Sequence, residues 1–162
     1  MERAVFLDRD GVLNRLIFNP ATGEYESPHT ATDFAIYPGT VATLRRLQQH
    51  GYMLFLVSNQ PSYAKGKTTL ENIKAIHALL HEALTAGGVE FKEYYYCYHH
   101  PHGIVPGYSG SCACRKPGSY FLDEAKKKYC YSTTDSWMVG DQDSDILCGR
   151  ACGLQTILIE NK

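Results

Sequence analysis

The stretch Phe6-Leu7-Asp8-Arg9-Asp10-Gly11-Val12-Leu13-Asn14 decides the fold of this chain. The apolar run from Ala4 to Leu7 predicts a short buried strand, which ends in two aspartates one residue apart. Residues i and i+2 of a strand point to the same side, so the carboxylates of Asp8 and Asp10 would lie together at the same end of the sheet. Ligands bind at the carboxyl ends of strands in open α/β sheets. Two carboxylates close together are unfavourable unless a cation or a developing positive charge lies beside them, so the pair predicts a ligand site. The alternative is that the motif is only a polar turn in which one aspartate caps a helix.

Length and composition limit the kind of protein this is. The 162 residues predict one domain, residues 1–162, with ample length for a core. A hydrophobic content of 44% and a charged content of 20% are typical of globular proteins. The net charge of -1 argues against nucleic acid or an acidic membrane as a partner. With no long apolar run and no signal-peptide layout, the sequence predicts a cytoplasmic monomer that acts on a small molecule.

Strands and helices alternate along the chain, which is typical of a doubly wound, mainly parallel α/β sheet. Further strands are expected over residues 52–57, 91–98, 136–139 and 156–159. Helices are expected from Thr40, which can cap the first of them, to residue 50, and over residues 69–86, 119–129 and 143–152. The polar segment 14–37 is expected to be a long surface loop beside the site. The connections are too short for a large cap domain.

Three more of the predicted strands end in polar signals. They are Ser58-Asn59, then Arg115-Lys116-Pro117, and finally Gly140-Asp141 with Asp143 and Asp145. Alone, each has an ordinary explanation: a turn, surface cations, or an acid-rich helix start. Together they suit one kind of site, because the acids can bind a divalent cation while the neutral donors and a lysine can bind a phosphate.

This order of motifs resembles the haloacid-dehalogenase (HAD) superfamily of aspartate-nucleophile phosphatases. The matching positions are Asp8 and Asp10 in motif one, Ser58 in motif two, Lys116 in motif three, and Asp141 with Asp145 in motif four. The resemblance implies that Asp8 attacks phosphorus while Asp10 protonates the leaving oxygen and then activates water. It also implies Mg²⁺ held by Asp8, the backbone carbonyl of Asp10 and Asp141. Ser58, Asn59 and Lys116 would then neutralise the phosphoryl oxygens.

Cysteines and a histidine close a second candidate site. Cys97-Tyr98-His99 and Cys112-Ala113-Cys114 offer three thiolates and one imidazole, the ligands of a tetrahedral structural Zn²⁺. Cysteines without a metal are the alternative, and His100 or His102 could replace His99 as the fourth ligand. The Cys-x-His spacing favours His99. Cys148 and Cys152 are expected to be small core residues.

The zinc loop narrows the resemblance to the zinc-containing histidinol-phosphate and heptose-bisphosphate phosphatases. The residues that carry it are Cys97 to Pro101 and Cys112 to Pro117. It implies substrate contacts from Asn59, Gln60 and Arg115, with the Arg115 guanidinium suited to a second phosphate. The implied substrate is D-glycero-D-manno-heptose 1,7-bisphosphate, cleaved at C7; histidinol phosphate or another small phosphate monoester is the alternative. The alternative that is not an enzyme is a zinc-stabilised binding module without turnover.

Two segments depart from the family pattern. Residues 61–66 replace a small glycine-containing segment, and Gln142 stands where the heptose enzymes commonly have a lysine. His77 and His81, four residues apart on a predicted helix, are expected on its flank and solvent face rather than as metal ligands. The three tyrosines at positions 94–96 are expected to pack in the core and at its edge.

Overall fold

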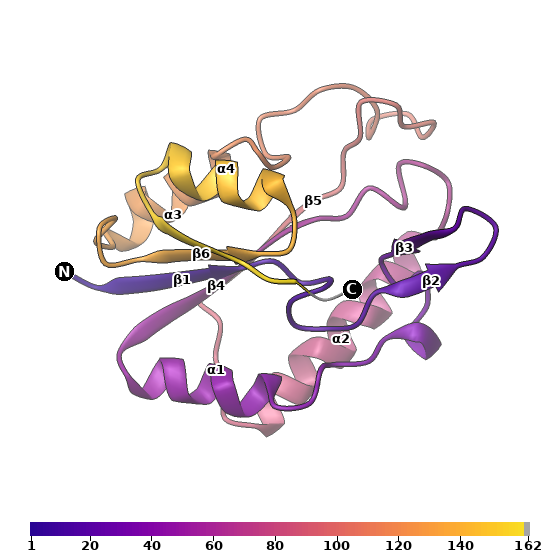
Figure 1. The fold of residues 1–162 in the computed structure, drawn as a ribbon. Helices are drawn as coiled ribbons and strands as arrows, with labels where there is room; N and C mark the ends of the chain where they lie inside the picture. Colours follow the sequence, from indigo (N-terminus) through magenta and orange to yellow (C-terminus); the bar gives the residue numbers. More distant parts are fainter. Residues whose placement is uncertain (161–162) are drawn as a thin grey trace.

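A five-stranded parallel sheet lies at the centre of the protein in the computed structural model, which describes residues 1–160 (Figure 1). Its strand order is β5-β4-β1-β6-β7. The strands are β1 (Arg3–Leu7), β4 (Tyr52–Asn59), β5 (Glu93–Cys97), β6 (Trp137–Gly140) and β7 (Gln155–Leu158). The helices are α1 (Thr40–Gln49), α2 (Leu70–Ala86), α3 (Tyr120–Tyr129) and α4 (Asp143–Ala151). The predicted doubly wound sheet without a large cap is therefore confirmed.

Two helical layers cover the sheet, with α1 and α2 on one face and α3 and α4 on the other (Figure 1). The alternation of β1 divides its side chains between two cores: Val5 and Leu7 pack on the α1/α2 side, and Ala4 and Phe6 on the α3/α4 side. Phe6 stacks on Phe55 of β4 with ring centroids 4.7 Å apart. Burial of each such large side chain contributes about 1.5–3 kcal/mol. This two-sided burial fixes β1 in the middle of the sheet.

The N-cap of α2 is the predicted residue, but the N-cap of α1 is not. The Thr69 hydroxyl accepts a hydrogen bond from the Asn72 amide at 3.1 Å and caps α2, as expected. At α1, however, Gly39 is the N-cap residue, with a φ of 83°. Thr40 is instead the first helical residue, and its hydroxyl donates to the Leu13 carbonyl at 3.3 Å. That bond ties α1 to the loop after β1.

The segment 14–37 is more ordered than predicted. It forms a two-stranded antiparallel hairpin, β2 (Ile17–Asn19) and β3 (Glu24–Glu26), followed by the 3-10 turn Ala31–Asp33. The expectation of a surface loop beside the site missed these strands, because three-residue strands with largely exposed side chains carry little periodic signal. An edge-to-face pair of Phe18 and Tyr25, with centroids 5.3 Å apart, helps to hold the hairpin together.

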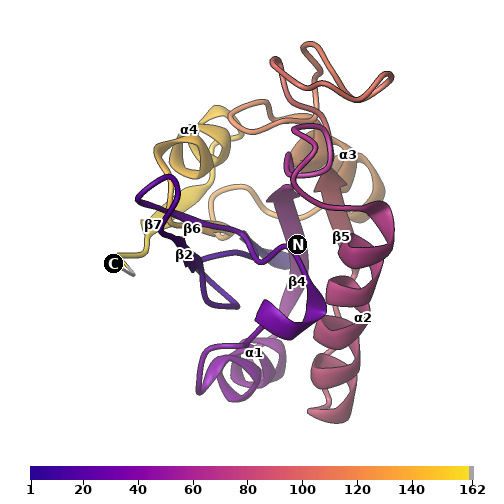
Figure 2. The same ribbon diagram turned by 90° about the vertical axis from the view of Figure 1, so that its right-hand side faces the viewer.

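The hairpin lies on the side of the molecule where the central strands end, as does the loop between β5 and α3 (Figures 1 and 2). An ion pair of 3.0 Å joins Lys67 Nζ to Glu26 Oε1 and ties the hairpin to the loop after β4. The Thr68 hydroxyl donates to the His29 carbonyl at 2.6 Å and adds a second tie.

Within residues 1–160, no helix combines the length and the apolar character needed to cross a membrane.

Candidate active site

The carboxyl ends of β1, β4 and β6 and the loop before α3 meet at one cavity of about 370 Å³. Its lining includes Asp8, Asp10, Asn59, Arg115, Lys116, Asp141 and Asp145. Parallel strands end at the same edge of a sheet, so residues far apart in sequence are brought together here. Asp8 and Asp10 are only 8% and 6% exposed. The cavity thus gathers predicted residues from motifs one, three and four, together with Asn59, the neighbour of the motif-two residue Ser58.

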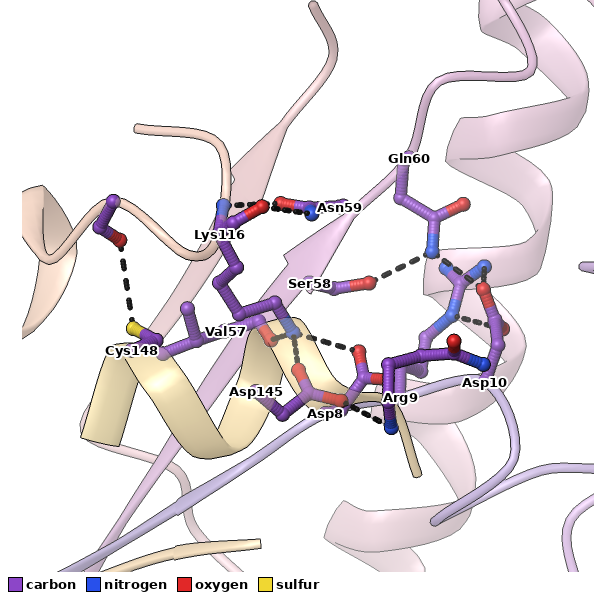
Figure 3. Close-up of polar contacts among 12 residues, drawn as sticks. Asp8, Arg9, Asp10, Val57, Ser58, Asn59, Gln60, Lys116, Asp145 and Cys148 are labelled. Carbon is purple, nitrogen blue, oxygen red and sulfur yellow. Dashed lines mark hydrogen bonds and ion pairs between the residues drawn. The ribbon is translucent and has the colours of Figure 1, made fainter. Parts of the chain in front are cut away.

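Lys116 is the central cation of this cavity and is almost fully buried. Its Nζ lies 3.1 Å from Asp8 Oδ1 and 2.5 Å from Asp145 Oδ1, and it donates to the Val57 carbonyl at 2.6 Å (Figure 3). Burial would lower the pKa of Lys116, but the charges of Asp8 and Asp145 outweigh that effect and raise it. Lys116 is therefore a fixed positive charge between two carboxylates. Sequence reasoning matched Asp145 to a motif but gave it no role in the site.

Asp8 has a strongly perturbed carboxyl group in this cavity. Burial raises the pKa of Asp8 to about 8, and the nearby charges of Asp145, Asp10 and Asp141 add to that rise while Lys116 opposes it. Carboxylate oxygens of Asp8, Asp141 and Asp145 lie within 4.8 Å of one another. Hard oxygen ligands at this spacing fit a Mg²⁺ ion, which would relieve the crowding of negative charge.

Asp10 has a different environment, because four hydrogen bonds hold its carboxylate. Oδ1 accepts from Arg9 Nε at 3.0 Å and from Asn14 Nδ2 at 2.9 Å. Oδ2 accepts from Gln60 Nε2 at 2.7 Å and from Arg9 Nη2 at 3.4 Å (Figure 3). Burial alone would raise the pKa of Asp10, but Arg9 and these hydrogen bonds keep it below its usual value. Sequence reasoning missed Arg9 and Asn14, although an arginine between two buried aspartates was a visible signal.

The predicted residues at the end of β4 support their neighbours. The Ser58 hydroxyl accepts from Gln60 Nε2 at 2.8 Å, so Gln60 bridges Ser58 and Asp10. Asn59 binds the main chain of Lys116 twice: its Oδ1 accepts from the Lys116 amide at 3.0 Å, and its Nδ2 donates to the Lys116 carbonyl at 3.2 Å. These bonds fasten β4 to the loop that carries Lys116. Substrate contacts by Asn59 and Gln60 remain a prediction.

Cationic side chains gather on the outer part of the cavity. Arg115, Lys65 and Lys67 line it, together with Glu24 and Glu26 of the hairpin. Burial lowers the pKa of Lys65, and the charges of Lys67 and Arg115 act in the same direction. Nη1 of Arg115 is buried and has no hydrogen-bond partner among the described residues. An anion that accepts from this nitrogen would satisfy it.

The predicted zinc ligands also lie together. Cys97 Sγ is 2.8 Å from Cys114 Sγ and 3.4 Å from Cys112 Sγ, and His99 Nδ1 is 3.8 Å from both Cys97 and Cys114. Tetrahedral zinc with Zn–S bonds of ~2.3 Å has ligand atoms ~3.8 Å apart. The separations of 3.4 and 3.8 Å are close to that value, whereas the Cys97–Cys114 sulfur pair would have to open by about 1 Å to take Zn²⁺. This group contains His99, not His100 or His102. Cys148 is buried in the α3/α4-side core, as expected.

Comparisons with known proteins agree with this geometry. Residues 113–161 match the HAD-hydrolase-like family model. The D-glycero-α-D-manno-heptose-1,7-bisphosphate 7-phosphatase of Photorhabdus laumondii is 32% identical over 152 residues, covering 94% of this chain and 79% of the relative. The D-glycero-β-D-manno-heptose-1,7-bisphosphate 7-phosphatase of Haemophilus influenzae is 36% identical over 149 residues, covering 92% and 76%.

A solved structure has the same architecture. The D,D-heptose 1,7-bisphosphate phosphatase of B. bronchiseptica, complexed with magnesium and phosphate, superposes with a TM-score of 0.76 at 27% identity. The match covers 96% of this chain and 79% of that one. Sequence identity along most of the chain and a shared fold lead to one family. The chain belongs to the HAD-superfamily phosphatases, in the family that contains the heptose-1,7-bisphosphate 7-phosphatases.

Proposed function

We propose that this phosphatase depends on Mg²⁺ and removes the C7 phosphate of D-glycero-D-manno-heptose 1,7-bisphosphate through an aspartyl phosphate on Asp8. The observation that carries the proposal is the contact of Asp8 with Lys116, beside Asp10 and Asp141 in one cavity. A carboxylate fixed by a buried lysine suits in-line attack on phosphorus, where positioning and charge stabilisation supply most of the catalysis. The substrate is proposed from the names of the relatives and from the cationic outer cavity.

In the first half-reaction, a carboxylate oxygen of Asp8 forms a bond to phosphorus as the bond to the leaving oxygen breaks. Lys116 keeps Asp8 oriented and neutralises charge on the phosphoryl oxygens. Asp10 delivers a proton to the leaving oxygen. In the second half-reaction, Asp10 takes a proton from the water that attacks the phosphorus of the aspartyl phosphate. Once it has given up its proton, Asp10 is ionised, which is the state that its lowered pKa favours.

Asp8, Asp141 and the main-chain carbonyl of Asp10 are the proposed ligands of Mg²⁺, which would act as a Lewis acid on the phosphoryl oxygens. The mutual distances of the Asp8, Asp141 and Asp145 oxygens support a cation between them. Asp145 is already paired with Lys116, so we assign it to holding the lysine. Zn²⁺ on the Cys97–Cys114 loop would be structural, fixing the chain just before Arg115 and Lys116.

The outer cavity supports a second phosphate on the substrate. Arg115 offers a buried nitrogen that has no hydrogen-bond partner within residues 1–160, and Lys65 lines the same cavity. Of the two hairpin carboxylates, Glu26 is neutralised by Lys67 at 3.0 Å, with His29 Nε2 at 3.6 Å. A guanidinium fork and an ammonium group are well shaped for a phosphate.

Histidinol phosphate remains the second candidate because Glu24 also lines the cavity and could meet its amine. The discriminating experiment compares phosphate release from the heptose bisphosphate, histidinol phosphate and p-nitrophenyl phosphate with Mg²⁺ present. We expect the highest kcat/KM for the bisphosphate, and no turnover of any substrate by Asp8→Asn. Better turnover of histidinol phosphate would overturn the substrate while leaving the phosphatase in place.

A further inference from the structure

Arg9 links the candidate acid–base residue to the interior of the protein. Its side chain is 1% exposed, and its Nε and Nη2 both donate to the Asp10 carboxylate. Beyond Asp10, the guanidinium carbon lies 5.6 Å from the centroid of the Tyr96 ring on β5. A cation over an aromatic face is attracted by the ring quadrupole. The guanidinium is therefore paired with Asp10 and at the same time within cation–π range of the Tyr96 ring.

Tyr96 is in turn held by helix α2. The Tyr96 hydroxyl and His77 Nδ1 are 2.7 Å apart, with the hydroxyl donating when His77 is neutral with its proton on Nε2. Burial lowers the pKa of His77, as do the charges of His81 and Arg9, which favours that neutral form. The Tyr94 ring packs edge-to-face on His77 with centroids 4.6 Å apart. His77 thus lies on the flank of α2, as expected, where it is half-buried and bonded to the sheet.

We propose that Tyr96 and His77 are positioning residues that act on Asp10 through Arg9. This inference rests on the proposed function, in which Asp10 protonates the leaving oxygen. Arg9 is long and has many rotamers, so a fixed ring beside it keeps its fork aligned with the two oxygens of Asp10. His77 fixes the ring by binding its hydroxyl. Loss of either contact lets the guanidinium tilt and the Asp10 carboxyl turn with it.

The chain contains a matched control pair one helical turn further along α2. His81 Nδ1 lies 3.1 Å from the Tyr94 hydroxyl, which repeats the His77–Tyr96 arrangement on the same two elements. That pair leads away from the cavity, since the Tyr94 ring stacks on Phe91 at 5.3 Å. The Tyr94 and His81 rings also pack on His77, with centroids 4.6 and 6.2 Å away, so the controls must keep a ring at both positions. His81→Phe and Tyr94→Phe do so and remove only the polar atoms of the bond.

The test compares two leaving groups. An alkyl phosphate needs a proton on its leaving oxygen, whereas p-nitrophenolate leaves without one, and kcat/KM reports the steps up to phosphoryl transfer. We expect Tyr96→Leu to lower kcat/KM for the alkyl phosphate about tenfold, a part of the 10²–10⁴ that general acid catalysis contributes. His77→Phe and Tyr96→Phe should each lower it about threefold, and p-nitrophenyl phosphate should be almost unaffected.

His77→Asn places an amide oxygen near the position of Nδ1 and should restore the alkyl activity that His77→Phe loses. His81→Phe and Tyr94→Phe should leave both activities unchanged, and thermal unfolding identifies any variant that is simply less stable. Equal losses for both leaving groups, or equal losses in the control pair, would overturn the inference while the phosphatase function stands. If the unmodified protein releases no phosphate from either compound, the proposed function fails, and this inference fails with it.

Discussion

Lys116 Nζ lies 3.1 Å from Asp8 Oδ1, although 108 residues separate the two in sequence. The contact joins the first strand to the loop that follows the candidate zinc ligands. Asn59, at the end of β4, adds to this connection, because its side chain binds the main-chain amide and carbonyl of Lys116. The proposed nucleophile is thus in contact with a segment that directly follows the candidate zinc ligands.

Lys116→Met should abolish phosphate release and lower the free energy of unfolding by about 3–5 kcal/mol, because it leaves Asp8 and Asp145 buried without their counter-ion. Urea unfolding and phosphate-release assays measure the two effects. Lys127→Met is the matched control, since Lys127 lies on the surface in a pair with Glu124 and should change neither quantity. Retention of activity by Lys116→Met would contradict the role of the lysine.

Arg115→Ala should reduce kcat/KM for the heptose bisphosphate by about ten- to a hundredfold, the worth of a charge-assisted hydrogen bond of roughly 1.5–3 kcal/mol. The same change should have little effect on p-nitrophenyl phosphate, which has no second phosphate. Steady-state kinetics on both substrates measure the ratio. A uniform loss on both would move Arg115 from substrate recognition to the support of Lys116.

Magnesium binding and pH should be coupled through Asp8. Its carboxyl has a pKa of about 8 in the folded, metal-free protein, above its ordinary value of 3.8. Between these values the folded state binds more protons than the unfolded state, so this group makes the metal-free protein less stable as pH rises. Mg²⁺ competes with that proton and should bind more tightly at pH 8 than at pH 6.

Thermal unfolding of the unmodified protein and Asp8→Asn, with and without Mg²⁺, measures this coupling. The stabilisation by Mg²⁺ should grow with pH in the unmodified protein. In Asp8→Asn, the metal-free loss of stability that Asp8 causes should disappear. If the metal-free protein and Asp8→Asn had the same pH dependence, the perturbed carboxyl would have to be another residue.

Zinc should be present at one ion per chain in protein purified without added metal. Cys112→Ser should lose the ion, loosen the 97–114 loop and lower activity through Arg115 and Lys116. Elemental analysis together with hydrogen exchange of the loop measures both effects. Cys130→Ser is the control, because Cys130 is exposed and does not belong to the group of candidate ligands. Normal loop protection in a zinc-free Cys112→Ser protein would rule out a structural ion.

The sequence predicted the central strands and helices because each carries a clear period and a clear stop. The run 4–7 and the glycines after α1 and α2 are examples. The hairpin β2–β3 was missed, since its exposed three-residue strands are held by contacts with distant residues such as Lys67. The sequence motifs predicted which side chains line the cavity, but not which of them form hydrogen bonds and ion pairs with one another. That Asn59 binds the Lys116 main chain and that Arg9 holds Asp10 are tertiary facts with no local pattern.

The central claim is that Asp8 becomes covalently phosphorylated, and trapping that species tests it most directly. Asp10→Asn should slow hydrolysis of the intermediate, while p-nitrophenyl phosphate still phosphorylates the enzyme because its leaving group needs no proton. After rapid acid quench, peptide mass spectrometry should place one phosphoryl group on Asp8, and Asp8→Asn should carry none. Release of p-nitrophenol at the normal rate with no phosphoryl group on Asp8, or with the group on another residue, would contradict the mechanism.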